Sequence, residues 1–169
     1  MSDKKIKENI SNLRKIMRQN ILDAYIVPHN DESLSEYVPV NKERLKWVCG
    51  FSGSAGSLII TASNLYLFTD GRYILQAKKQ TRNIKCQVIN ISDISVFKFL
   101  LLNNTKFKTV GIETKTISVS DYLNLKKLIS NTNLNIKIIN NNLLDRIWKR
   151  NLNVQNNNKI FFLSVKYTG

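Results

Sequence analysis

The sequence has few of the residues from which self-contained metal and redox sites are most often built. Its 169 residues include one histidine, two cysteines and two prolines. A single histidine excludes a two-histidine metal centre within one chain. Cys49 and Cys86 cannot form a disulfide framework and lack the C-x-x-C spacing of redox or zinc motifs. We therefore expect a reduced, cytoplasmic setting.

Long apolar runs are also missing. No run approaches the roughly 18 residues that a membrane span requires. The N-terminal stretch MSDKKIKENI carries charges without an apolar segment behind them, so we expect no signal peptide and no membrane partner. A hydrophobic content of 43% nevertheless favours a globular domain over a disordered chain.

Acidic residues are outnumbered, with 12 Asp and Glu against 26 Lys and Arg, which gives a net charge of +14. Such a surplus is typical of partners of polyanions. Here, however, the basic residues are spread along the chain, and no RNP-like, zinc-finger or helix-turn-helix signature accompanies them. A nucleic-acid-associated protein is the least favoured of the functions considered.

The hydrophobic pattern predicts alternating helices and strands. The first helix runs through Ile6 and Met17 at helical spacing, with Ser2 or Asp3 available as its N-cap. Further helices are expected at residues 43–49, from 73, at 92–102, 118–129 and 143–148, and strands at 24–27, 57–61, 64–69, 84–89, 109–113 and 136–139. The strands at 57–61 and 64–69 read as a hairpin. This order predicts an α/β fold, a mixed β-sheet covered by helices on both faces.

A change in composition predicts a domain boundary near residue 150. Lys149 to Lys159 is polar and rich in asparagine, which is typical of a linker. Ile160 to Leu163 then reads as one more strand, which has no partner of its own. We expect one domain at 1–150, and at 151–169 a linker with the first strand of a second domain.

No complete active site is apparent. A thiol site combining His29 with Cys49 or Cys86 is conceivable, but cysteines in apolar contexts more often belong to a core. The carboxylates of Asp31, Glu32, Glu36 and Asp70 have no spacing that pairs them for glycosidase chemistry. The stretch GFSGSAG lacks the Gly-Lys-Ser/Thr ending of a P-loop and does not fit the G-x-S-x-G elbow.

The stretch GFSGSAGSLIIT, Gly50 to Thr61, holds three of the chain's six glycines and is followed by TDGRY, Thr69 to Tyr73. Such glycines allow positive φ angles and close approach of neighbouring chain, either in a tight corner or beside a ligand. Arg72 follows an Asp-Gly turn at a strand end, where ligands of α/β proteins collect. It could bind a carboxylate or carbonyl, or it could be solvated or paired with Asp70.

These stretches together resemble the N-terminal domain of the creatinase/aminopeptidase P family, in particular eukaryotic-type cytosolic Xaa-Pro aminopeptidases. The similar segments are LRKIM, AYIVPHND, SEY, GFSGSAGSLIIT, FTDGRYILQAKKQ, NLLDRIWK and KYTG. They span essentially the whole chain, with residues 90–133 similar only in pattern. The resemblance implies a creatinase/prolidase N-terminal domain fold, which is ribonuclease H-like.

The resemblance also implies a function. Enzymes of this family release an N-terminal residue that precedes proline, in a C-terminal domain with two divalent metal ions, usually manganese, on two Asp, two Glu and one His. This chain lacks that set, so by this resemblance it has no catalytic residue and binds no cofactor. Its implied role is that of a lid, a dimer contact and a substrate contact. Arg72 would reach the peptide and Asp70 would orient it, with the catalytic domain supplied in cis or in trans. The alternative is a stand-alone binding or assembly module of the same fold.

Overall fold

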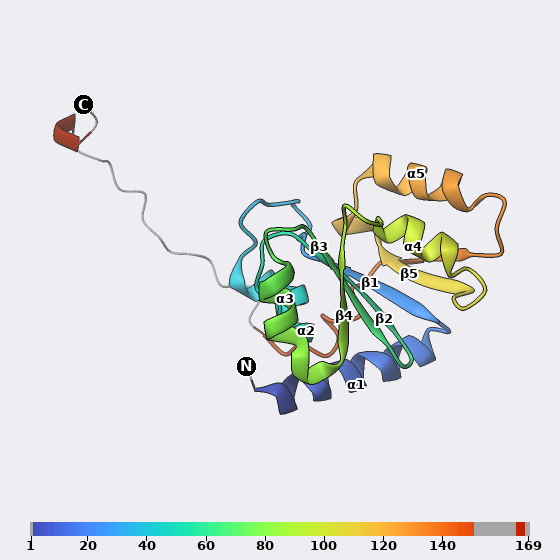
Figure 1. Cartoon of the computed structure of the whole chain (residues 1–169), viewed down its shortest axis with the longest axis horizontal. Coiled ribbons are helices and arrows are strands. Elements are labelled where there is room, and N and C mark those ends of the chain that lie inside the picture. Colours follow the sequence, from blue (N-terminus) through green and yellow to red (C-terminus); the bar gives the residue numbers. More distant parts are fainter. Residues whose placement is uncertain (1, 151–164, 168–169) are drawn as a thin grey trace.

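The chain folds around one six-stranded sheet. The computed structural model describes residues 2–150 and 165–167, and Figure 1 shows the sheet between two groups of helices. In chain order, the strands are β1 (Ala24–Pro28), β2 (Ser57–Thr61), β3 (Leu65–Thr69), β4 (Cys86–Asn90), β5 (Thr109–Glu113) and β6 (Asn135–Ile139). Their spatial order is β4-β3-β2-β1-β5-β6.

The sheet is mixed because one strand, β2, runs against the direction of the other five. β2 is antiparallel to both β1 and β3, whereas β1–β5, β3–β4 and β5–β6 are parallel pairs. Every strand except β2 therefore ends at the same edge. That carboxyl edge gathers the segments that follow β1, β3, β4 and β5, together with the start of β2.

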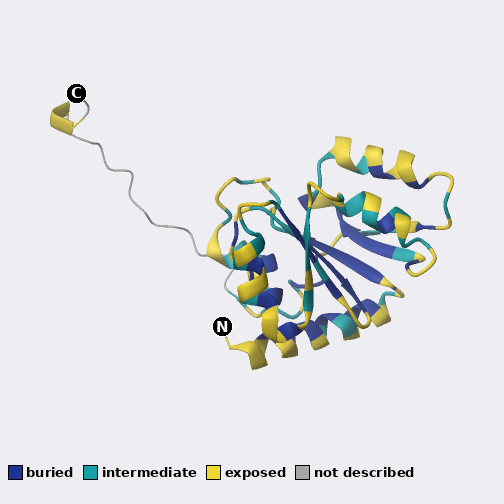
Figure 2. Cartoon of the chain, viewed as in Figure 1, coloured by how far each residue is buried: buried dark blue, intermediate teal, exposed yellow. Residues whose placement is uncertain are grey.

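Helices cover both faces, as the sequence predicts. α1 (Asp3–Gln19), α2 (Arg44–Cys49) and α3 (Ile74–Thr81) lie on one face, and α4 (Val96–Leu102) and α5 (Val119–Ile129) lie on the other. Side chains alternate along β1, so that Tyr25 and Val27 join the first core and Ala24 and Ile26 join the second. Figure 2 shows the buried residues concentrated between these layers.

The predicted start of α1 and end of α2 are both confirmed. The Ser2 hydroxyl accepts a hydrogen bond from the Lys5 amide and caps α1. The apolar stripe of α1 packs against the sheet, with Leu13 fully buried, which contributes about 1.5–3 kcal/mol for each such side chain. α2 ends at Gly50, whose φ of 80° is in the left-handed region.

Two elements begin later than the sequence indicates. β4 starts at Cys86 and not at residue 84, because Lys85 takes a left-handed φ of 52° that interrupts the extended chain. α4 starts at Val96 and not at residue 92. The Ser92 amide bonds the Asn90 side chain in a turn, and Ser95 provides the N-cap.

The helix expected at residues 143–148 is wrong, because the structure forms hydrogen-bonded turns there. Asn142 starts them, since its side-chain oxygen accepts from the Leu144 amide at 2.9 Å. The Trp148 amide then bonds the Leu144 carbonyl at 2.8 Å, a single turn that is not continued. Trp148 instead stacks on Trp47 of α2, with ring centroids 5.3 Å apart. The strand expected at 160–163 and most of the expected linker lie outside the described residues.

Candidate functional site

Arg72 lies in the turn that follows β3 at the carboxyl edge, and its side chain is 73% exposed. Asp70 holds one edge of the guanidinium: Nε donates to Oδ1 at 3.1 Å and Nη2 donates to Oδ2 at 2.8 Å. The Arg72 amide also donates to Asp70 Oδ1. Hydrogen bonds from Arg72 lower the pKa of Asp70 below its usual range. The local pairing considered from the sequence is therefore present, and Nη1 takes no part in it.

The glycine stretch contacts this same turn. Ser54 Oγ and the Tyr73 hydroxyl share a hydrogen bond of 2.7 Å. Tyr73 packs edge-on against the buried ring of Phe51 and lies beside the Arg72 guanidinium, with Cζ 5.3 Å from the ring centroid. The two motifs of the sequence are thus one structural unit. The pairing of Ser54 with Tyr73 could not be predicted from the sequence, because no local pattern connects residues in different loops.

The glycines act mainly through close packing, which corrects part of the sequence-based interpretation. Only Gly50 has a positive φ in this stretch. At Gly53 a Cβ atom would lie 2.3 Å from Cζ of Phe51, and at Gly56 it would lie 3.1 Å from the Phe68 carbonyl oxygen. Only glycine, which has no Cβ atom, therefore fits at these two positions when the loop folds over Phe51 and places Ser54 beside Tyr73.

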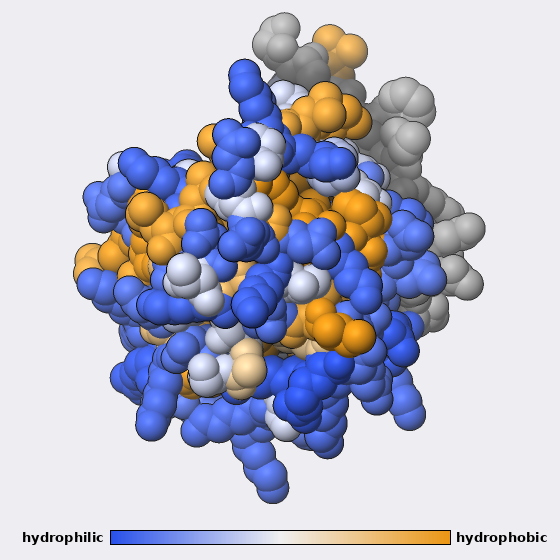
Figure 3. All heavy atoms as spheres, turned by 90° about the vertical axis from the view of Figure 1, so that its right-hand side faces the viewer, coloured by the Kyte–Doolittle hydropathy of each residue, from blue (hydrophilic) through white to orange (hydrophobic). Residues whose placement is uncertain are grey.

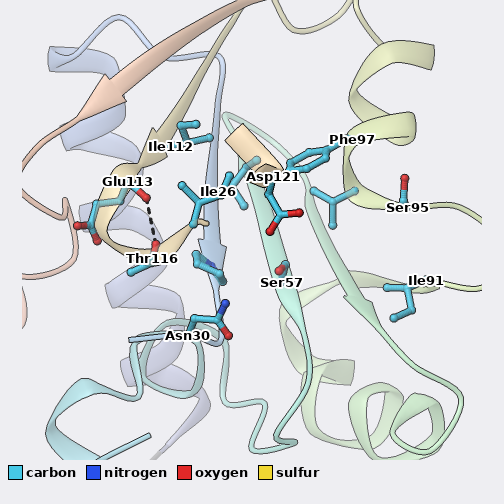
Figure 4. Close-up of a pocket in the computed structure, with 13 residues that line it drawn as sticks. Ile26, Asn30, Ser57, Ile91, Ser95, Phe97, Ile112, Glu113, Thr116 and Asp121 are labelled. Carbon is cyan, nitrogen blue, oxygen red and sulfur yellow. Dashed lines mark hydrogen bonds between the residues drawn. The ribbon is translucent and has the colours of Figure 1, made fainter. Parts of the chain in front are cut away.

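A largely apolar cavity of about 420 Å³ opens at the same edge, between β1, β5 and the starts of α4 and α5. Figure 4 shows Ile26 and Ile112 along its wall and Asp121 pointing toward its centre, while the Glu113 carboxylate points away. Glu113 Oε2 instead accepts from Asn142 on the other face of the sheet. Asp121 caps the start of α5 with Ser118. Among the described residues that line the cavity, these two carboxylates are therefore engaged in separate local contacts.

The surface outside this cavity is partly apolar as well. Figure 3 shows orange apolar atoms among polar ones on the side that carries α4 and α5. Val119 and Leu123 of α5 are 75% and 58% exposed. A second cavity of about 290 Å³ adjoins the first and extends toward His29 and Ser54. The carboxyl edge is therefore hollowed from the glycine loop to α5.

The structure does not assemble the thiol site considered from the sequence. Cys86 begins β4, at the end of the sheet opposite to His29, which follows β1. Cys49 is fully buried in α2, and its Sγ donates to the Leu45 carbonyl. Burial raises the pKa of both thiols to about 12, which disfavours a reactive thiolate. Burial also lowers the pKa of His29, against the opposing charges of Glu43 and Asp31.

An ion network that the sequence did not indicate lies beside the carboxyl end of β5. Arg44 is almost completely buried and donates to both oxygens of Asp145 and to Glu32. Lys42 pairs with Glu32 and Arg150 pairs with Asp145. Burial alone raises the pKa of Glu32, but the hydrogen bonds from Arg44 and Lys42 outweigh it and hold that pKa at about 2. The network fastens the segment after β6 to α2 and to the loop after β1.

Residues 2–150 and 165–167 contain no group of three or more His, Cys, Asp or Glu side chains that could hold a metal ion. Among the same residues, no helix has the length and apolar character needed to cross a bilayer.

Comparison with known proteins decides the family. The sequence profile described as "Creatinase/Prolidase N-terminal domain" matches residues 9–140. The chain belongs to this family. The six-stranded mixed sheet and the family match together confirm the α/β fold expected from the sequence.

The curated relatives of this creatinase/prolidase N-terminal domain are considerably longer proteins. A probable Xaa-Pro aminopeptidase P of Laccaria bicolor is 35% identical over 96% of this chain, which covers 26% of that protein. Xaa-Pro aminopeptidase 1 of Dictyostelium discoideum is 35% identical over 97% of this chain, covering 28% of that protein. The chain thus spans about a quarter of the length of the relatives that it matches.

Solved structures agree with this assignment. The X-prolyl aminopeptidase of Caenorhabditis elegans, described as a cytosolic enzyme with a di-nuclear active site, superposes with a TM-score of 0.77 and 26% identity. The match covers 85% of this chain and 25% of that one. The N-terminal domain of a cytoplasmic peptidase from Mycobacterium tuberculosis matches with a TM-score of 0.65 and 21% identity, over 83% of this chain and 98% of that one. That likeness concerns the fold.

Proposed function

We propose that this chain is the non-catalytic N-terminal domain of a cytosolic, metal-dependent Xaa-Pro aminopeptidase, which releases an N-terminal residue that precedes proline. The supporting observation is the extent of the relationship. Similarity runs along 96% of this chain but covers only 26% of the Laccaria bicolor protein. Because the described residues hold no metal-binding group, the two divalent ions belong, in this proposal, to a separate catalytic domain.

In this proposal, the domain contributes a substrate contact to the enzyme, and this contact lies at the carboxyl edge of the sheet. Asp70 binds the Nε–Nη2 edge of Arg72, whose side chain is 73% exposed and whose Nη1 takes no part in this pair. A guanidinium so placed can donate to a carbonyl or carboxylate oxygen of a bound peptide. In this proposal the domain is a lid that contacts the substrate and takes part in a homodimer, and the catalytic domain is joined in cis or bound in trans.

Activity measurements test the proposal. The purified 169-residue chain is assayed with manganese for release of the first residue from an X-Pro peptide, and we expect no turnover. Residues 2–150 of this chain then replace the matching N-terminal domain in the Caenorhabditis elegans enzyme. We expect this chimera, if folded, to retain turnover. Deletion of the N-terminal domain from the same enzyme should abolish turnover. Turnover by the chain alone, or a folded but inactive chimera, would contradict the proposal.

A second function is a stand-alone binding module with the same fold. In such a module, the hollowed carboxyl edge would bind a partner without any catalytic domain. The coding sequence downstream of Gly169 separates the two functions. A region with two Asp, two Glu and one His in the order of a metal-dependent aminopeptidase supports the enzyme, and its absence from the genome supports the module.

A further inference from the structure

The side chain of Arg72 is constrained on two sides although it is largely exposed. Asp70 takes its Nε–Nη2 edge through two hydrogen bonds of 3.1 and 2.8 Å. The ring of Tyr73 lies 5.3 Å from the guanidinium carbon, within the range of a cation–π contact. These contacts fix the direction in which the remaining N–H groups point.

Tyr73 is itself held by the glycine loop. Its hydroxyl shares a 2.7 Å hydrogen bond with Ser54 Oγ, and its ring packs at 82° against Phe51, which is 1% exposed. A continuous set of contacts therefore runs from the buried core through Phe51 and Tyr73 to the exposed guanidinium. Arg72 itself is 73% exposed, so its ion pair with Asp70 alone would anchor the guanidinium only weakly.

We infer that Tyr73 and Ser54 are positioning residues for Arg72, and that they hold its guanidinium ready to donate to a carbonyl or carboxylate oxygen of the peptide. This inference rests on the proposed function. A free arginine side chain loses rotamer entropy when it is immobilised. Contacts that restrict it beforehand reduce this cost and so tighten binding without touching the ligand. The glycine stretch and the Asp-Gly-Arg turn thus act together to position the guanidinium.

The first test uses the 169-residue chain itself. Solvent exchange of the Arg72 Nε–H is measured by nitrogen-15 NMR in the unchanged chain and in Tyr73→Phe, Ser54→Ala and Ser54→Thr variants. The loss of one hydrogen bond is expected to accelerate exchange about five-fold in Tyr73→Phe and Ser54→Ala. Ser54→Thr keeps a hydroxyl and should exchange at the original rate. Equal exchange in all four proteins would overturn the inference, whatever the enzyme assays show.

The second test measures kinetics in the chimeric enzyme. Tyr73→Phe is expected to raise KM for an X-Pro peptide about five-fold with kcat unchanged, because the position of Arg72 serves binding. In an Arg72→Ala background, the same change should have no further effect, which a merely structural role for Tyr73 would not predict. Additive effects would refute the positioning role while leaving Arg72 in place. No effect of Arg72→Ala would instead refute the substrate contact proposed above.

Discussion

Arg44 and Asp145, which lie 101 positions apart in the sequence, form a two-point ion pair. Nε of Arg44 donates to Oδ1 of Asp145 at 2.8 Å, and Nη2 donates to Oδ2 at 2.7 Å. The Arg44 side chain is 3% exposed and Asp145 is 28% exposed. This pair closes the domain, because it connects the first residue of α2 to the turns that follow the last strand.

Replacing Arg44 by Met should therefore destabilise the domain. We expect a loss of about 3 kcal/mol, the lower end of the range for a broken buried ion pair, because the partner carboxylates keep some contact with water. Urea unfolding followed by circular dichroism measures this loss. Arg146→Met, an exposed position beside Asp145, serves as the control. Equal midpoints for the two variants would show that the pair contributes nothing.

The acid stability of the domain should depend on Glu32. Its pKa is lowered from 4.5 to about 2 in the folded chain, so its ionised form stabilises the fold. That contribution is complete above pH 4.5 and is lost as the pH falls toward 2. In Glu32→Gln, the free energy of unfolding should fall less steeply over this range than in the unchanged chain. The exposed Glu36 provides a matched Glu36→Gln control, and a steep fall in both variants would place the acid sensitivity elsewhere.

The glycine loop offers a paired test of close packing. A methyl group at Gly53 would lie 2.3 Å from the Phe51 ring, whereas Gly71 has no atom within 4 Å of its added Cβ. Gly53→Ala should cost about 1–3 kcal/mol of stability through overpacking. Gly71→Ala should leave the midpoint of thermal unfolding nearly unchanged. If both variants unfold alike, the loop does not depend on its small residues.

The substrate contact can be tested at Arg72 in the chimeric enzyme. Arg72→Ala should lower kcat/KM, and the decrease should correspond to a loss of about 1–3 kcal/mol of transition-state stabilisation. Arg72→Lys keeps the charge but not the planar fork, so it should recover only part of the loss. Because the side chain is exposed, neither change should alter the circular dichroism spectrum. Unaltered kinetics in Arg72→Ala would remove this residue from the site.

Local patterns in the sequence predicted most elements of the fold. The stripe from Ile6 to Met17 and the glycine after Cys49 mark α1 and the end of α2, because periodicity and capping are local properties. Residues 143–148 do not form the helix that their apolar spacing predicts, because these side chains contact the core and Trp47. The strand order and the partners of Arg44 depend on distant segments, for which one sequence carries no local signal.

Local sequence patterns predicted only part of the candidate site. Asp70 and Arg72 are neighbours in a turn, so their pairing was open to prediction. The hydrogen bond between Ser54 and Tyr73 was not, because it depends on how the loop before β2 folds over Phe51. Residues in separate loops meet only after the sheet has formed.

The stacking of Trp47 on Trp148 provides an intrinsic fluorescence probe of the contact between α2 and the segment after β6. These are the chain's two tryptophans, and their rings lie 5.3 Å apart at 19°. Intrinsic tryptophan emission therefore comes from a single place, the seam where the segment after β6 rests on α2. A change in that emission registers the release of this segment, even while the far-ultraviolet signal of the sheet stays constant.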